Sequence, residues 1–212
     1  DNSAMVSGGA IIFLNQYLLR IEKCSFLGNK VLIPTDDYGG GGGALFFSGY
    51  STLYVANHFG LLELPGTFIE DSTFDSNYCT GDVFGGAILL NSESVWTHIN
   101  KCKFTNNTSS RGGAVTIVTH QMSITNSEFI GNRGTDGAGL VIVIAQNVTI
   151  TECLFKSNVA LDYAGALFVG STISNITNCT FRENVAQTGG ALSTRDGIKK
   201  MFIENSHFCS NV

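Results

Sequence analysis

The sequence is poor in residues that mark many common functions. It has two prolines, one tryptophan and four histidines, and charged residues make up only 14% of the chain. It contains no basic stripe, which argues against nucleic-acid binding. It also contains no run of 18 apolar residues, which argues against a transmembrane helix. No Cys-x-x-Cys pair occurs, so a zinc site is not expected.

Glycine, by contrast, is abundant and recurs at a regular place. Seven times a glycine opens an apolar run that is followed by a Phe-x-x-Asn motif. The glycines are Gly9, Gly43, Gly86, Gly113, Gly139, Gly165 and Gly190, and the motifs start at Phe26, Phe74, Phe104, Phe129, Phe155, Phe181 and Phe208. The last five phenylalanines are 25, 26, 26 and 27 residues apart. A nearly fixed period of this size indicates a solenoid.

Each repeat is too short for two packed helices, and its local pattern favours strands. Residues 124–129 and 150–155 are rich in β-branched side chains and alternate in polarity. We therefore predict an all-β fold, a right-handed parallel β-helix of about seven coils. The hand is taken from the general preference of parallel crossovers. At one strand spacing per coil, such a rod would be roughly 34 Å long.

Three further positions carry one kind of residue when the repeats are aligned on phenylalanine. Five residues earlier lies isoleucine, at Ile21, Ile69, Ile99, Ile124, Ile150, Ile176 and Ile203. Two residues earlier lies Cys24, Ser72, Cys102, Ser127, Cys153, Cys179 or Ser206. Three residues later lies Asn29, Asn77, Asn107, Asn132, Asn158, Asn184 or Asn211. None of these residues is charged, so we expect them to face inward and to stack as ladders at roughly 4.8 Å spacing.

The same alignment predicts two backbone features. The residue before the Cys/Ser position is often Asn or Asp, which tolerate the left-handed backbone region, so we expect a bend there. The recurrent glycine is expected to face a crowded interior corner that has no room for a Cβ. The stacked asparagines are expected to form an amide ladder that satisfies buried polar groups.

One solenoid domain is expected to span residues 1–212, with insertions at about 32–41 and 49–66. Asn2 and Asn211 both occupy the asparagine position, so the chain starts and stops at the same point of a coil. This arrangement is typical of a segment of a longer chain, or of copies that stack end to end. The expected partners are therefore neighbouring coils of a longer chain or a second copy.

The paired motifs resemble those of a known family. Residues 8–11, 42–45, 85–88 and 112–115 read Gly-Gly-Ala followed by Ile, Leu or Val. Together with the Phe-x-x-Asn motifs they are similar to the repeats of the chlamydial polymorphic outer-membrane proteins and of some protist surface proteins. The resemblance covers almost the whole chain and implies a right-handed β-helix, surface display and adhesion. Ala138-Gly139 and Ala164-Gly165 depart from the pattern, because both lack the first glycine.

Six cysteines are consistent with an oxidising exterior but leave the pairing open. Cys153 and Cys179 occupy the same ladder position on adjacent coils, where a disulfide would suit the spacing. The alternative is that they pack as buried thiols. Cys79 and Cys209 lie outside the ladder and are expected nearer the surface.

Asp136 and Asp162 hold matching positions before the glycine motif on neighbouring coils, and Arg111 lies close by in the preceding coil. Such a group would suit a calcium ion or a sugar. The alternative is that both aspartates are ordinary turn residues, because Asp is common in turns. Calcium is the one cofactor that the sequence suggests.

Two further kinds of surface site are expected. N-glycosylation sequons start at Asn106, Asn147, Asn175 and Asn178, whereas the sequon at Asn107 falls in the inward ladder and should be inaccessible.

The second insertion carries the aromatic and imidazole side chains of Tyr50, Tyr54, His58 and Phe59. Insertions in repeat proteins often form the binding face, so these residues are candidates for partner contact. The alternative is that they pack against the flank of the solenoid.

These features favour a non-enzymatic extracellular rod, either a surface adhesin or a fibre segment that contacts itself, surface proteins or glycans. The alternative function is a carbohydrate-active enzyme of the parallel β-helix class, a polysaccharide lyase or hydrolase. An enzyme of that class needs a groove with close, exposed carboxylates. A third function, a passive glycosylated coat, would carry sugars on several of the sequon asparagines.

Overall fold

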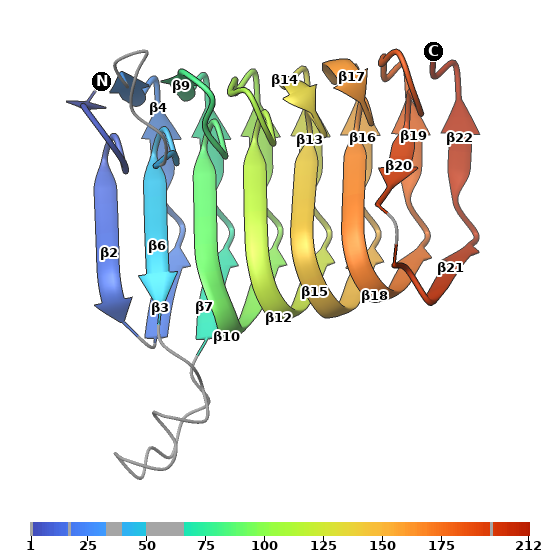
Figure 1. The fold of residues 1–212 in the computed structure, drawn as a ribbon, viewed down its shortest axis with the longest axis horizontal. Helices are drawn as coiled ribbons and strands as arrows, with labels where there is room; N and C mark the ends of the chain where they lie inside the picture. The colour runs from blue at the N-terminus through green and yellow to red at the C-terminus, as the bar shows by residue number, and fades with distance from the viewer. Residues whose placement is uncertain (1, 17, 33–39, 50–65, 196) are drawn as a thin grey trace, which may run out of the picture.

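The computed structural model describes residues 2–16, 18–32, 40–49, 66–195 and 197–212. Within these ranges the protein is all β, without a helix, and its strands stack in parallel as a β-solenoid of about six turns (Figure 1). The predicted fold class is confirmed, although the seven repeats span about six full turns rather than seven. The right hand of the coil stays a prediction. No helix in the described ranges is long and apolar enough to cross a membrane.

The longest face of the solenoid is a ten-stranded sheet, which we call the long sheet. Its strands are β2 (Ile11–Gln16), β3 (Leu18–Glu22), β6 (Leu45–Gly49), β7 (Gly66–Glu70), β10 (Ile88–Asn100), β12 (Val115–Thr125), β15 (Leu140–Thr151), β18 (Leu167–Thr177), β20 (Leu192–Thr194) and β21 (Lys200–Glu204). In the central coils a single long strand runs the whole face, as in β12, β15 and β18.

The opposite face is a seven-stranded sheet, the phenylalanine sheet, with one strand from every repeat. Its strands are β4 (Ser25–Leu27), β8 (Thr73–Asp75), β11 (Lys103–Thr105), β13 (Glu128–Ile130), β16 (Leu154–Lys156), β19 (Thr180–Arg182) and β22 (His207–Cys209). Short strands close the third side of each coil. They are β1 (Ser3–Ala4), β5 (Lys30–Leu32), β9 (Tyr78–Thr80), β14 (Arg133–Asp136) and β17 (Val159–Tyr163).

Two left-handed residues per coil bend the chain around each end of the phenylalanine strand. The first precedes the Cys/Ser position, as predicted, with φ between 46° and 55° at Lys23, Asp71, Lys101, Asn126, Glu152, Asn178 and Asn205. The second precedes the ladder asparagine, with φ between 53° and 66° at Gly28, Ser76, Asn106, Gly131, Ser157, Glu183 and Ser210. The second bend was not predicted. Because L-residues rarely adopt this conformation, its presence at Lys23 and Glu152 shows that the stack imposes it.

The predicted apolar ladders form the core. Phe74, Phe104, Phe129, Phe155 and Phe181 are fully buried, and consecutive rings stack with centroids 4.6–5.0 Å apart and planes within 12°. Such a separation between nearly parallel rings corresponds to offset stacking, which aromatic pairs prefer. The isoleucine ladder is equally buried from Ile69 to Ile176. Only the last coil differs, because Ile203 and Phe208 are 44% and 45% exposed.

The asparagine row forms the predicted amide ladder. From Asn77 onward, each side-chain oxygen accepts both the backbone N–H and the Nδ2 of the asparagine one coil earlier, as between Asn132 and Asn158 at 3.0 and 2.9 Å. From Asn77 onward, each Nδ2 also donates to a phenylalanine carbonyl, as from Asn158 to Phe129 at 2.9 Å. The ladder runs from Asn2 to Asn211 without a break. An amide satisfies this position because it is donor and acceptor at once.

The recurrent glycine faces a crowded corner, and the crowding comes from the next coil. A Cβ on Gly86 would lie 2.0 Å from the carbonyl oxygen of Gly113. One assignment was wrong, however. Val115 pairs with Leu140, so Ala138 fills the recurrent-glycine position in that coil and Gly139 fills the following alanine position. The glycine motif is thus displaced by one residue in this coil, because Gly137 takes the left-handed conformation that Gly112 has one coil earlier.

We predict that Phe155→Ala lowers the free energy of unfolding by about 3–5 kcal/mol, because it leaves a cavity between two stacked rings. The matched control is Leu154→Ala, since Leu154 is the adjacent residue on β16 and is only partly buried. Urea denaturation of both variants measures the difference. Equal losses in the two variants would contradict the inward assignment of phenylalanine.

We also predict that Asn158→Ala destabilises the fold by more than about 3 kcal/mol, because several buried donors and acceptors lose their partners at about 1–3 kcal/mol each. Asn147, which is exposed on β15, supplies the control substitution Asn147→Ala. Thermal and urea unfolding report the effect. Near-neutral behaviour of Asn158→Ala would show that the amide ladder contributes little.

Candidate functional site

A groove crosses the outer face of the long sheet where its strands fall out of register. Toward β12, Ile142 pairs with Ile117 and Ile144 pairs with Val118, so Val143 between them has no partner on that strand. On the β18 side the register shifts between Ile142 and Ala145. Val143 is therefore a β-bulge residue. Bulges redirect side chains and are over-represented next to active sites.

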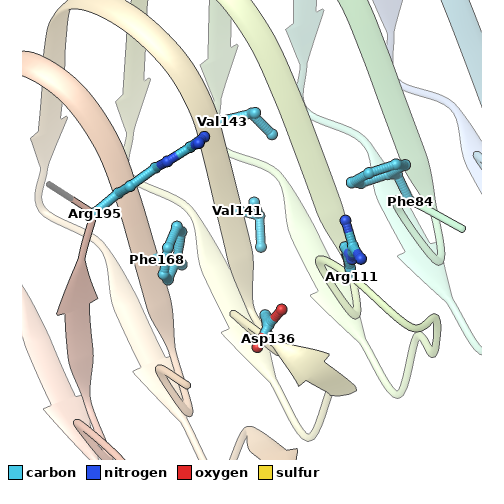
Figure 2. Close-up of a pocket in the computed structure, with 7 residues that line it drawn as sticks. All are labelled: Phe84, Arg111, Asp136, Val141, Val143, Phe168 and Arg195. Atoms are coloured by element: carbon cyan, nitrogen blue, oxygen red, sulfur yellow. The ribbon is translucent and has the colours of Figure 1, made fainter. Parts of the chain in front are cut away.

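The first part of the groove is a hollow of about 320 Å³ (Figure 2). It is lined by Phe84, Arg111, Asp136, Val141, Val143, Phe168 and Arg195. Val141 forms the floor and is 5% exposed. Figure 2 shows Arg195 reaching across one side of the hollow and Arg111 standing beside Phe84 on the other, with Asp136 at the edge between them. The hollow thus combines apolar surface with charges of both signs.

A second hollow of about 290 Å³ continues the groove on the far side of Arg195. It shares Val143 and Arg195 with the first and adds Ser171 and Thr172. Gly170 lies in this part, and a Cβ there would be 2.4 Å from the carbonyl oxygen of Val143. The glycine is therefore required by the backbone, and it also keeps the groove free of a side chain.

Arg111 and Asp136 are neighbours on successive coils, paired through their backbones. The Arg111 guanidinium lies 5.3 Å from the centroid of the Phe84 ring and 3.5 Å from the Asp82 carboxylate. Asp136 has a buried carboxylate oxygen, Oδ1, which finds no hydrogen-bond partner among the described residues. Burial raises the pKa of Asp136; Arg111 opposes this, and the nearby Asp162 carboxylate adds to it.

The two aspartates suggested for calcium do not lie in register. Asp136 pairs with Tyr163 rather than with Asp162, because the register between β14 and β17 shifts after Gly134. The carboxylates are near enough to interact, but no group of three or more metal-ligating side chains occurs in the described part of the chain. Calcium binding there stays a prediction.

The cysteines divide by position. In the structure all six are free thiols, with Cys153 and Cys179 buried on adjacent coils, and a disulfide between these two stays a prediction. Their side chains nevertheless interact, and the hydrogen bond to Cys179 together with burial raises the pKa of Cys153. Cys209 is exposed as expected, but the expectation for Cys79 was wrong. Cys79 is buried with Val31 under the short strands, and burial raises its pKa to about 12.

The sequon asparagines Asn106, Asn147, Asn175 and Asn178 are all exposed, and Asn107 is fully buried in the ladder as expected. Sugars could therefore reach the four predicted acceptors, and glycosylation itself stays a prediction. The candidate contact residues of the second insertion, Tyr50, Tyr54, His58 and Phe59, lie outside the described residues.

Sequence reasoning found Asp136 and Arg111 but missed the groove. Phe84 and Phe168 precede and follow different glycine motifs, and Arg195 belongs to an irregular stretch of the last repeat. They converge because Phe84, Arg111 and Asp136 pair in turn on successive coils and Phe168 pairs with Val141. A helpful signal was available, since Val141-Ile-Val-Ile144 departs from the alternation expected of a strand with one solvated face.

Comparison with known protein families, with curated proteins and with solved structures finds no match. The resemblance to the chlamydial and protist repeats therefore stays a prediction.

We predict that Asp136→Asn raises the melting temperature at neutral pH. The folded-state pKa is raised, so the protonated carboxyl favours folding, and this contribution is lost as pH rises from the ordinary value of 3.8 through the folded pKa. The difference in melting temperature between the variant and the parent should therefore become smaller as the pH is lowered toward 3. Glu152→Gln, at an exposed carboxylate, is the control. A lower melting temperature for Asp136→Asn at neutral pH would contradict the assigned environment.

Proposed function

We propose that this chain is a non-enzymatic extracellular rod that acts as an adhesin or as a segment of a fibre. The observation that carries the proposal is the uninterrupted stack of phenylalanine, isoleucine and asparagine ladders. These ladders use the repeated residues for the interior and leave the outer faces to vary from coil to coil. A stack of this kind is a stiff spacer that presents different contacts along its length.

The outer surface supports contact with partners. Ile144, Leu161 and Tyr163 are 57%, 66% and 49% exposed on the central coils, and Trp96 is 44% exposed. Exposed apolar side chains of this size are groups that a binding partner would cover.

An enzymatic role receives less support. Asp136 is the one carboxylate among the described residues that line the groove. Asp82 and Asp162 lie outside its lining, and Asp82 is paired with Arg111. Glycoside hydrolysis needs two carboxyl groups on either side of a bound sugar, one of them free to act as a general acid. The polysaccharide lyase or hydrolase remains the alternative that the experiment addresses.

The test measures adhesion and catalysis on the same preparation. Beads coated with the chain are expected to bind cells or extracellular matrix more than beads coated with the unfolded chain, and electron microscopy is expected to show rods or end-to-end fibres. Incubation with acidic polysaccharides should release no new reducing ends or unsaturated products. Turnover of a polysaccharide would favour the enzyme, and the absence of both adhesion and fibres would overturn the proposal.

A further inference from the structure

We propose that the groove on the long sheet binds a pyranose that carries one carboxylate, such as a uronic or sialic acid unit of a surface glycan. The inference rests on the proposed extracellular role and names the ligand that this groove would contact. The juxtaposition that supports it is the Arg195 guanidinium, the Asp136 carboxylate and the Phe168 ring around one hollow (Figure 2).

Arg195 supplies the anion-binding group. Its side chain is exposed over the groove, and the ion pairs found among the described residues do not include it. Arg111, by contrast, is already paired with Asp82 and stacked on Phe84. A planar guanidinium that has no acidic partner in the described part of the chain suits bidentate binding of a carboxylate. The groove therefore offers one open site for an anion.

Asp136 restricts the ligand to one that also donates hydrogen bonds. Its side chain is partly exposed and lines the hollow, whereas its Oδ1 is buried and out of a ligand's reach. Sugar hydroxyls are donors that would satisfy such a carboxylate. A ligand with many sulfates or phosphates offers fewer hydroxyl donors to it. The combination selects a single carboxylate set among hydroxyl groups.

The apolar lining matches the face of a sugar ring. Phe84 and Phe168 are partly buried, and Val141 and Val143 form the surface between the polar groups. A volume of about 320 Å³ lies at the small end of small-molecule sites, which suits one ring rather than a folded peptide. The adjoining hollow of about 290 Å³, with Ser171 and Thr172, would take the next unit of an oligosaccharide.

The stability cost of the Asp136 carboxylate also favours a role in binding. A buried acceptor without a partner costs stability, and burial also disfavours the ionised carboxylate. Proteins commonly tolerate such local costs where function requires them. The bulge residue Val143 and Asp136 line the same hollow.

The test uses calorimetry with the whole chain and defined oligosaccharides. The probes are a hyaluronan oligosaccharide for uronic acid, sialyllactose for sialic acid, the carboxyl-reduced form of each, and a heparin oligosaccharide as a polysulfated comparison. We expect one carboxylated probe to bind, and its reduced form to bind at least about tenfold more weakly, since a charge-assisted hydrogen bond contributes that much. Which probe binds identifies the source of the carboxylate.

Three variants locate the site. Arg195→Gln and Asp136→Asn should each weaken binding at least about tenfold. Arg133→Gln should leave binding unchanged, because Arg133 is exposed on β14 and does not line the groove. Asp136→Asn is expected to fold at least as well as the parent, so a loss of binding there would not reflect unfolding.

The inference is overturned if neither carboxylated probe binds, if Arg195→Gln binds as well as the parent, or if heparin binds best and Arg133→Gln weakens it equally. Bead adhesion measured in parallel separates the two proposals. Adhesion that persists without sugar binding would remove the glycan site and leave the adhesive rod, whereas loss of both would remove the rod proposal as well.

Discussion

The whole structure depends on the stacking of like residues at one strand spacing. Because each coil lies directly over the previous one, a side chain in the interior meets its own counterpart on both sides. Only residues that interact favourably with copies of themselves can fill such positions. Phenylalanine does so through offset stacking, isoleucine through packing, and asparagine through an amide that donates to one neighbour and accepts from the other. Charged residues cannot, which explains their absence from the ladders.

This constraint also explains which parts of the fold could be predicted from the sequence. Ladder positions repeat the same physical problem, so Phe129, Ile150 and Asn158 were assigned correctly. The first bend was predicted because Asn126 and Asn178 favour it, whereas the second bend is occupied by residues as different as Gly131 and Glu183. The alignment failed around Gly139, because Gly137 shifts the motif by one position and a spacing rule cannot detect which glycine takes the left-handed conformation.

The candidate site lies where the repetition breaks. The bulge at Val143, the register shift that places Asp136 beside Tyr163, and the irregular stretch around Arg195 all occur near one another on the outer face. Residues from different coils meet there because each coil contributes only one or two side chains to any patch. Sequence reasoning could name Asp136 and Arg111, but it could not bring Phe168 and Arg195 to them, since that depends on the local register.

The central claim, one strand spacing per repeat along the whole rod, is tested most directly by distances between spin labels. Ser25, Thr73, Thr180 and His207 lie in one outward row of the phenylalanine sheet. With the exposed Cys24 and Cys209 replaced by serine, cysteine-linked labels at 73/180, 25/180 and 25/207 are separated by four, five and six coils. The account predicts mean backbone separations of about 19, 24 and 29 Å, in equal steps of roughly 4.8 Å. Unequal steps, or distances that do not grow with the number of coils, would contradict it.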